Sequence, residues 1–344
     1  MKISICVPQY NRINFLLQSL DLITQQTYQD IEVVISDDCS TDNTQESITA
    51  LQATYKYPLV YFRNPVNKGY DANYRQCIEL ATGDYCIVIG NDDSIYGAGS
   101  IQYLADFLEA NSYPEIGYVN FVEARDPSHV IERAYSTGIM GSGPEVALKN
   151  YSCFSFVGGL IYHKKSFERF NTDKHDGSIY AQMYLGCRMI ASGCRLFSIR
   201  EPLIIKDLEV DEKPRQSYRD VIARKWKDYK IEQGGLPSVI NVLIDAFRDS
   251  GTLTQQIIYK IFRRIYCVTY PHWVVDYKSN GALPAAVGLV QGLHPARNTN
   301  FKLLSGVNKV KLYSMYLLFS GAALVTPATL FNKVKSTLYA RLKK

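Results

Sequence analysis

Short apolar runs alternate with segments of helical periodicity along the first 205 residues of the chain. Runs such as ISICV at 3–7 and IEVVIS at 31–36 predict buried strands, because a strand covered on both faces is apolar almost without interruption. Between these runs, apolar residues recur every three or four positions, which is typical of amphipathic helices. The predicted strands are 3–7, 31–36, 59–63 and 85–89, and the predicted helices are 15–24, 44–55, 72–81 and 178–191.

This alternation predicts an α/β fold, in which helices cover both faces of a mostly parallel sheet. Right-handed crossovers bring the carboxyl ends of parallel strands to one edge of the sheet, where open α/β sheets bind their ligands. The residues that directly follow each strand are therefore the first place to look for a site.

The pattern changes after about residue 205. Helical segments rich in Lys, Arg and Tyr are predicted over 221–232, 237–248 and 253–269, and a segment rich in Gly, Pro and Asn predicts a loop over 279–300. A chain of 344 residues also exceeds the size at which one hydrophobic core usually stops growing. We therefore expect two domains, an α/β domain at 1–205 and a helical region at 206–344.

The end of the chain contains a stretch, 312–332, without a charged residue. Its length is about that of a bilayer span, but polar residues dilute it and Pro327 interrupts a helix. A helix that lies on a membrane surface fits this pattern better than a clean span, and a helix packed against the α/β domain is the alternative. The basic residues that flank the stretch are Lys309, Lys311, Lys333, Lys335, Arg341, Lys343 and Lys344.

Composition narrows the class of protein. Hydrophobic residues make up 47% of the chain and charged residues 21%, as in an ordinary folded protein. The net charge of +5 is mild, favours anionic ligands without selecting one, and gives no reason to expect a nucleic-acid partner. The eight cysteines are scattered without a CxxC pair, and no charged leader precedes a long apolar segment, so a cytoplasmic location is expected. The five histidines show no paired spacing, which disfavours zinc.

Polar residues gather where three predicted strands end. The sequences are PQYNR at 8–12, DDCSTD at 37–42 and GNDD at 90–93. Five aspartates and no lysine at two of these ends are costly unless something cationic or hydrogen-bonding lies between them. Magnesium-like cations prefer such oxygen ligands and are commonly held by one or two carboxylates together with substrate phosphates. The pattern predicts a divalent metal with a phosphorylated ligand.

Each of these motifs also has a purely structural interpretation. Ser40 or Asp42 would cap a helix that begins at Thr44, and 90–93 would be an ordinary loop. The functional interpretation depends on the joint placement of the motifs at successive strand ends.

The stretches ISICVPQYNR, SLDLITQQTYQDIEVVISDDCSTDNT and RNPVNKGYDANYRQCIELATGDYCIVIGNDD resemble the opening of family-2 glycosyltransferases. The resemblance covers about the first 100 residues and implies the GT-A fold, a Rossmann-like nucleotide-binding sheet. The GNDD form is similar to abequosyltransferase-like enzymes of O-antigen assembly. The implied activity is transfer of a sugar from a nucleotide-diphosphate donor to a lipid-linked or surface-polysaccharide acceptor, with Mg²⁺ or Mn²⁺, on the cytoplasmic face of the inner membrane.

The resemblance also implies roles for individual residues. Asp38, with Asp37 assisting, would hydrogen-bond the base or ribose, and Arg12 would approach the diphosphate. Asp92 corresponds to the last residue of an Asp-x-Asp metal motif whose first position is Gly90 here, so Asn91 or Asp93 would compensate. The other residues implied at the nucleotide are Pro8, Tyr10, Asn11, Asn67 and Gly69.

The residues that would act on the acceptor are less clearly indicated by the sequence. A carboxylate that takes the proton of the acceptor hydroxyl is expected, but the Glu-Asp pair common in the family is absent. Asp176 is the candidate, with Asp173 and His175 as substitutes and Asp93 as a second catalytic carboxylate; 172–177 is equally compatible with a solvated loop. Gly158 and Gly159 lie where the acceptor loop is expected, and a structural turn would also explain them.

Other function classes leave different signals in a sequence. A dinucleotide oxidoreductase needs GxGxxG after the first strand, and the motif is absent. A sugar nucleotidyltransferase is a weaker alternative, since PQYNR is not a glycine-rich phosphate loop. A degenerate transferase that binds carbohydrate or acts as a scaffold stays open, because of Gly90 and the missing Glu-Asp pair.

Overall fold

The computed structural model describes residues 1–210, 236–331 and 333. The chain divides into two compact units, Met1–Lys213 and Pro214–Lys344. The helix predicted at 221–232 lies outside the described residues, as do four of the predicted basic flanking residues, Lys335, Arg341, Lys343 and Lys344.

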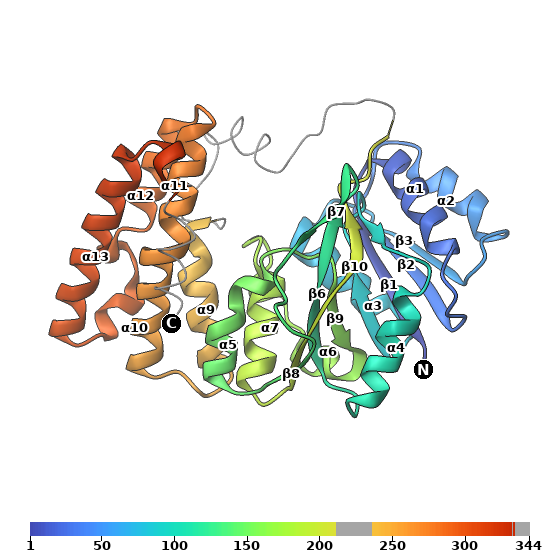
Figure 1. The fold of residues 1–344 in the computed structure, drawn as a ribbon, viewed down its shortest axis with the longest axis horizontal. Coiled ribbons are helices and arrows are strands. Elements are labelled where there is room, and N and C mark those ends of the chain that lie inside the picture. Colours follow the sequence, from blue (N-terminus) through green and yellow to red (C-terminus); the bar gives the residue numbers. More distant parts are fainter. Residues whose placement is uncertain (211–235, 332, 334–344) are drawn as a thin grey trace. The chain divides into compact units, whose positions relative to one another are not determined.

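The first unit is built on a mixed, mostly parallel sheet (Figure 1), which confirms the predicted fold class. The strand order is β3-β2-β1-β4-β9-β6-β10-β5, with β7 paired to β6 and β8 to β10. Neighbours from β3 to β4 are parallel, as are β6 and β10, whereas β9 runs antiparallel between β4 and β6. The strands are β1 Ile3–Gln9, β2 Ile31–Asp37, β3 Leu59–Arg63, β4 Tyr85–Val88, β5 Ser94–Ile95, β6 Ile116–Glu123, β7 Asp126–Ile131, β8 Gly138–Gly141, β9 Leu160–His163 and β10 Leu196–Lys206.

Helices cover both faces of this sheet. Alternate side chains of β1 and β2 form a buried core with the apolar faces of α1, α2 and α4, in which Ile5, Leu16, Ile48 and Leu104 are fully buried. The opposite face packs against α3, where the Cys77 thiol lies 3.3 Å from a β2 carbonyl. The helices are α1 Ile13–Thr24, α2 Thr44–Gln52, α3 Tyr70–Leu80, α4 Ser100–Ala110, α5 Pro144–Asn150, α6 Lys164–Phe170 and α7 Ala181–Ala191.

Strand β1 lies between β2 and β4, so three of the predicted strand ends are neighbours. The register pairs Ile3 with both Ile31 and Tyr85, and pairs Gln9 with Asp37. All three strands run in the same direction and are almost completely buried, which confirms the prediction from their uninterrupted apolar runs.

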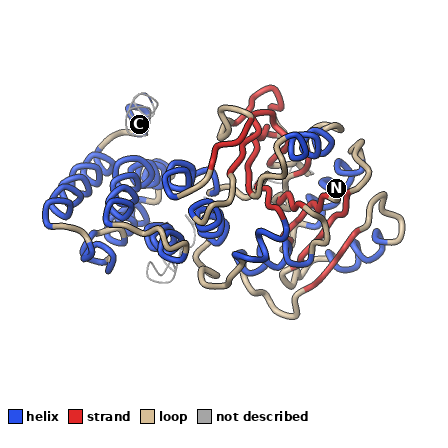
Figure 2. Tube along the Cα trace, turned by 90° about the horizontal axis from the view of Figure 1, so that it is seen from below, coloured by secondary structure: helices blue, strands red, loops and turns tan. Residues whose placement is uncertain are grey.

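The described part of the second unit is helical, and the strands in Figure 2 lie in the first unit. Its longer helices are α9 Val239–Asp249, α10 Gln255–Arg264, α11 Tyr270–Ser279, α12 Leu283–Gly292 and α13 Gly306–Val325. A five-residue π-helix, Ile265–Thr269, joins α10 to α11. The loop predicted over 279–300 is wrong, because α12 lies within it: a proline in the first turn favours the start of a helix and is not a breaker there.

Helix α13 packs one face against its own unit. Leu312, Tyr316, Ser320 and Ala323 are buried, and the Tyr316 hydroxyl donates to the Val290 carbonyl at 2.7 Å. The Lys278 ammonium donates to three carbonyls at the C-terminal end of α13. The helix ends before Pro327, as expected for a residue that cannot continue it. Among the helices in the described ranges, none has the length and apolarity needed to cross a bilayer.

Candidate nucleotide and metal site

The turn after β1 has an unusual backbone conformation. Asn11 and Arg12 both have positive φ angles, 54° and 62°, which side-chain-bearing residues adopt at a cost of about 1–3 kcal/mol each. The end of β2 holds this turn in place: the Asn11 N–H donates to the Ser40 hydroxyl at 2.8 Å, and the Asn11 side-chain oxygen accepts from the Thr41 N–H at 2.8 Å. These hydrogen bonds connect the two strand ends, and the turn fixes the direction of the Arg12 side chain.

Gln9, which the sequence analysis did not single out, connects all three strand ends. Its carbonyl accepts the Asp38 N–H at 2.8 Å, and its Oε1 accepts the Asn91 amide at 2.9 Å. Its Nε2 donates to the Thr44 hydroxyl at 3.1 Å. Gln9 is completely buried. Its polar side chain at the end of an otherwise apolar strand was the signal that the sequence offered for this role.

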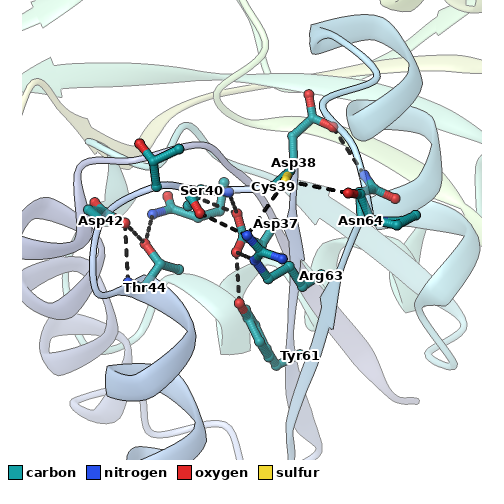
Figure 3. Close-up of polar contacts among 12 residues, drawn as sticks. Asp37, Asp38, Cys39, Ser40, Asp42, Thr44, Tyr61, Arg63 and Asn64 are labelled. Atoms are coloured by element: carbon teal, nitrogen blue, oxygen red, sulfur yellow. Dashed lines mark hydrogen bonds and ion pairs between the residues drawn. The ribbon is translucent and has the colours of Figure 1, made fainter.

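Asp37 is completely buried and its carboxylate is occupied within the protein (Figure 3). One oxygen accepts from the Ser40 N–H at 2.9 Å and from its hydroxyl at 2.5 Å, and the other from the Tyr61 hydroxyl at 2.7 Å. Arg63 lies 3.7 Å from the second oxygen. These contacts hold the turn that presents Asp38, so Asp37 supports the site from within.

Asp38 lies at the edge itself and contacts the loop before α3. Its carboxylate accepts the Lys68 N–H at 2.7 Å and the Gly69 N–H at 2.9 Å, and an Asn64 amide proton at 3.2 Å. Asn67 donates from its amide to the Asp38 carbonyl at 3.2 Å. Gly69 has a φ of 88° at the start of α3, a conformation that favours glycine. The predicted Asn67 and Gly69 turn therefore lies directly over Asp38.

Asp92 and Arg12 form an ion pair across the strand ends, with the Arg12 Nη1 atom 2.6 Å from the Asp92 Oδ2 atom. Both side chains are partly exposed, at 37% for Arg12 and 30% for Asp92. Tyr10 is 47% exposed beside them, and Pro8 is half-buried in β1.

Asp93, in contrast, is almost completely buried. Its carboxylate accepts the Gly90 N–H at 3.2 Å and the Asp207 N–H at 3.1 Å, so the residue after β10 closes over it. Burial, and secondarily the negative charge of Asp92, raise the pKa of Asp93 to about 7. A Cβ atom at Gly90 would lie 2.8 Å from the Asp93 carboxylate, which gives a steric reason for glycine at the position where the metal motif usually has an acid.

The Gly158 and Gly159 turn also lies close to Asp93. A Cβ atom at Gly158 would come within 2.8 Å of the Asp93 carboxylate, whereas one at Gly159 would collide with Val119 in the core. Arg133, which the sequence analysis missed, holds this turn: its guanidinium donates to the Gly158 carbonyl at 2.5 Å and to the Phe156 carbonyl at 2.9 Å. Burial lowers the pKa of Arg133 to about 10.

Asp176 contacts α3. Its two oxygens accept from Arg75, from Nε at 2.9 Å and from Nη2 at 2.6 Å. His175 packs its ring against Tyr184 of α7, with centroids 4.5 Å apart, and the Asp173 carbonyl accepts the Asp176 N–H at 2.9 Å. The arrangement matches the structural alternative for 172–177 at least as well as a catalytic role, because both oxygens of Asp176 are engaged.

Asp42 joins two helix starts. One oxygen accepts the Ile13 N–H at 3.0 Å, at the start of α1, and the other accepts the Thr44 N–H at 3.1 Å, at the start of α2. Asp42 therefore accepts N–H groups at the start of both helices, although the N-cap residue of α2 is Asn43 and not the predicted Ser40 or Asp42.

Within the described residues, no group of three or more His, Cys, Asp or Glu side chains is arranged to hold a metal ion. Asp92 is nevertheless a partly exposed carboxylate at the edge where Asp38 lies. A cation that keeps waters and takes its remaining ligands from phosphates needs only one or two such carboxylates. The residues present therefore fit a metal that arrives with a diphosphate, and they do not form a complete protein cage.

Comparisons with known proteins agree with this geometry. The family model "Glycosyl transferase family 2" matches residues 4–170. Abequosyltransferase RfbV from Salmonella typhimurium is 31% identical over 222 residues, which cover 60% of this chain and 66% of that protein. This chain therefore spans slightly under two thirds of the length of that relative.

Two solved structures share the fold. S. aureus TarS 1-349, in complex with UDP-GlcNAc, superposes with a TM-score of 0.61 at 14% identity, covering 94% of this chain and 91% of that one. The mannosyltransferase PcManGT from Pyrobaculum calidifontis, in complex with GDP-Man and Mn²⁺, has a TM-score of 0.53 at 18% identity, covering 96% and 87%. With these strand ends, the matching model and the bacterial relative, residues 4–170 of the chain are identified as a domain of family 2 of the glycosyltransferases.

Proposed function

We propose that this protein transfers a sugar from a nucleoside-diphosphate donor to a hydroxyl group of a lipid-linked or surface-polysaccharide glycan, as in O-antigen assembly. The observation that carries the proposal is the junction of three strand ends by residues 9–12. The Asp38 N–H is bound to the Gln9 carbonyl, and the Asp92 carboxylate is paired with Arg12. A nucleotide lying along this edge would have Asp38 near its nucleoside and Arg12 and Asp92 near its diphosphate.

The residues around the nucleoside are suited to its parts. Tyr10 offers an exposed aromatic ring on which a base can stack. Asp38 is held by backbone N–H groups and keeps acceptor capacity for a base or ribose donor. Asn11 and Asn91 fix the loops on either side of Tyr10, and Asn67 with Gly69 borders Asp38.

A divalent metal, Mg²⁺ or Mn²⁺, would be held by Asp92 together with the donor phosphates. When bound, it supplies positive charge for the diphosphate that leaves the sugar. Asp93 is buried and its oxygens accept two backbone N–H groups. We therefore propose a role for Asp93 other than coordination of the metal.

Proton removal from the acceptor hydroxyl requires a carboxylate or another base. Asp93 is the preferred candidate, because it contacts the Gly158 turn on the acceptor side and its pKa of about 7 lets it hold a proton at neutral pH. Asp176 is the second candidate, but it would first have to leave Arg75.

The surface of α13 is suited to contact with a membrane that carries the acceptor. Opposite its packed face, this helix exposes Val310, Leu317 and Leu318 at 59–67%, and Lys302 and Lys311 are exposed near its N-terminal end. An apolar stripe with nearby lysines is typical of a helix that lies on an anionic bilayer. Together with eight free cysteines, this supports a peripheral position on the cytoplasmic face of the membrane.

The main competing function is carbohydrate binding without turnover. Gly90 in place of an acid and the engaged oxygens of Asp176 favour it. Both functions would place a nucleotide sugar at the same edge, so binding alone does not separate them.

The test begins with thermal unfolding in the presence of UDP-, CDP-, GDP- and dTDP-sugars, each with Mn²⁺ or with EDTA. A donor at 100 times its Kd stabilises the folded state by about 2.7 kcal/mol, which is readily detected. The donor that stabilises the protein is then assayed for release of nucleoside diphosphate, with Asp92→Ala as the comparison. Release that Asp92→Ala abolishes supports transfer. Stabilisation without release from any donor supports the binding protein, and the absence of any stabilisation contradicts both.

A further inference from the structure

The Arg12–Asp92 ion pair places opposite charges at the two positions where the proposed ligands must bind. The Arg12 Nη1 atom lies 2.6 Å from the Asp92 Oδ2 atom, and both side chains are accessible to solvent. A divalent cation that binds Asp92 therefore competes with the guanidinium, and a diphosphate that binds Arg12 competes with the carboxylate. Arg12 therefore hinders the binding of a cation to Asp92, and Asp92 hinders the binding of a phosphate to Arg12.

The backbone keeps the two groups together in the absence of a ligand. Arg12 has a φ of 62° and directly precedes α1, next to Asn11 with a φ of 54°. Hydrogen bonds of Asn11 with Ser40 and Thr41 maintain this turn, and the Asp92 carbonyl accepts the Leu208 N–H at 2.8 Å. Both backbones are thus anchored, and the exchange needs only side-chain rotation.

The strength of the pair suits an exchange of partners. Ion pairs between partly exposed side chains contribute little free energy, so this one is easily broken. A guanidinium binds phosphate through two parallel hydrogen bonds, and a hard cation binds a carboxylate together with phosphate oxygens. A complex of a diphosphate with a divalent metal provides both new partners at the same time, a phosphate for Arg12 and a cation for Asp92.

We infer that Arg12 is an exchangeable counter-ion for Asp92. In the free protein it neutralises Asp92; a nucleoside diphosphate takes over Arg12 and so releases Asp92 for the divalent cation. Metal and diphosphate therefore bind cooperatively, beyond their affinity for each other. The inference rests on the proposed function, since it needs a diphosphate at this edge.

The sharpest test is binding of a nucleoside diphosphate without metal. UDP, CDP, GDP and dTDP are titrated calorimetrically in EDTA, and the one that binds most tightly is used for every variant. Asp92→Asn removes the carboxylate that competes with a diphosphate for Arg12, so it should bind this probe about fivefold more tightly than the natural chain in EDTA, and more weakly in Mn²⁺. Asp106→Asn, which removes an exposed charge on α4, is the matched control and should leave the affinity unchanged.

A double-mutant cycle separates exchange from simple charge repulsion. In an Arg12→Gln background, Asp92→Asn should no longer tighten binding in EDTA, whereas loss of repulsion would tighten it equally in both backgrounds. Arg12→Gln alone should raise the affinity for Mn²⁺ without nucleotide by about fivefold, measured by electron paramagnetic resonance. Equal affinity of Asp92→Asn and the natural chain in EDTA overturns the inference, as does an equal gain in both backgrounds. If none of the four diphosphates binds in any condition, the proposed function itself fails.

Discussion

At the scale of single residues, two aspartates compete for the role of proton acceptor. Asp93→Asn should lower kcat at least a hundredfold, the usual contribution of a general base, while the affinity for the donor changes little. Asp176→Asn should lower kcat less than tenfold and instead reduce the free energy of unfolding by about 1–2 kcal/mol, because Arg75 loses a two-point ion pair. Steady-state kinetics and urea unfolding of both variants check this. A larger loss of kcat in Asp176→Asn would reverse the assignment.

A buried acid far from the proposed chemistry gives a pH dependence. Burial alone would raise the pKa of Glu32, but hydrogen bonds from Lys2, Ser4 and Thr82 outweigh it and lower the pKa to about 2. Since the folded-state pKa is depressed, the stabilisation is complete above the unfolded value of 4.5 and disappears as the pH falls toward 2.

Glu32→Gln should therefore be less stable than the natural chain at pH 7, by on the order of 2 kcal/mol. The difference should shrink below pH 4.5, which urea unfolding at pH 7, 5, 4 and 3 measures. A difference in the free energy of unfolding that stays constant down to pH 3 would show that the stabilisation does not depend on the ionised carboxylate.

Sequence alone could locate the polar residues that follow the apolar strands, but not the residues that orient them. Asp38, Arg12 and Asp92 follow apolar strands and were found from that placement. Gln9 and Arg133 act through hydrogen bonds to segments distant in sequence. The polar position of Gln9 at the end of an apolar strand was a signal, but no local pattern marks Arg133. Asp37 and Asp38 look alike in sequence, and only the partners Ser40 and Tyr61 separate the supporting aspartate from the one at the edge.

At the scale of elements, strands β1 to β4 and the helices α1 to α3 between them followed from their period, whereas β5 to β10 were not predicted. Helix α12 was missed, since Gly, Pro and Asn residues at its ends concealed the apolar residues within it. The tail was recognised as apolar, but which face of α13 is buried depends on Tyr270 and Val290, to which Ser320 and Tyr316 bind.

The exposed face of α13 provides a test of membrane contact. Replacing Leu317 and Leu318, exposed at 59% and 67%, with Asn should weaken binding to anionic phosphatidylglycerol vesicles about tenfold, because two apolar side chains no longer enter the lipid. Co-sedimentation measures the effect, and added salt should weaken binding of the natural chain further. Tyr135→Asn, at a position exposed at 72% in the first unit, is the control. Equal sedimentation of all three proteins would contradict membrane contact through this face.

At the scale of the whole molecule, the proposed donor residues all belong to the first unit, between Pro8 and Asp93. Hydrogen exchange of the protein with Mn²⁺ and its best nucleoside diphosphate should therefore slow in residues 8–12, 37–42 and 67–70. Exchange in α9 to α13 should stay the same, because a ligand protects the segments that it orders. Protection that appears mainly in α9 to α13 would place the donor elsewhere.

The π-helix at Ile265–Thr269 has a consequence for how insertions and deletions are tolerated. Such a turn holds one residue more than an α-helical turn, and Tyr266 within it and Tyr270 directly after it both contact the ring of Tyr316. Deleting Val268 would remove this extra residue, so the chain would run on as a regular α-helix and the residues after it would keep nearly the same orientation. Tyr270 would then still face Ser320, whereas a shortening by one codon within the regular helix α10 would rotate everything after it by about 100° and separate α11 from α13.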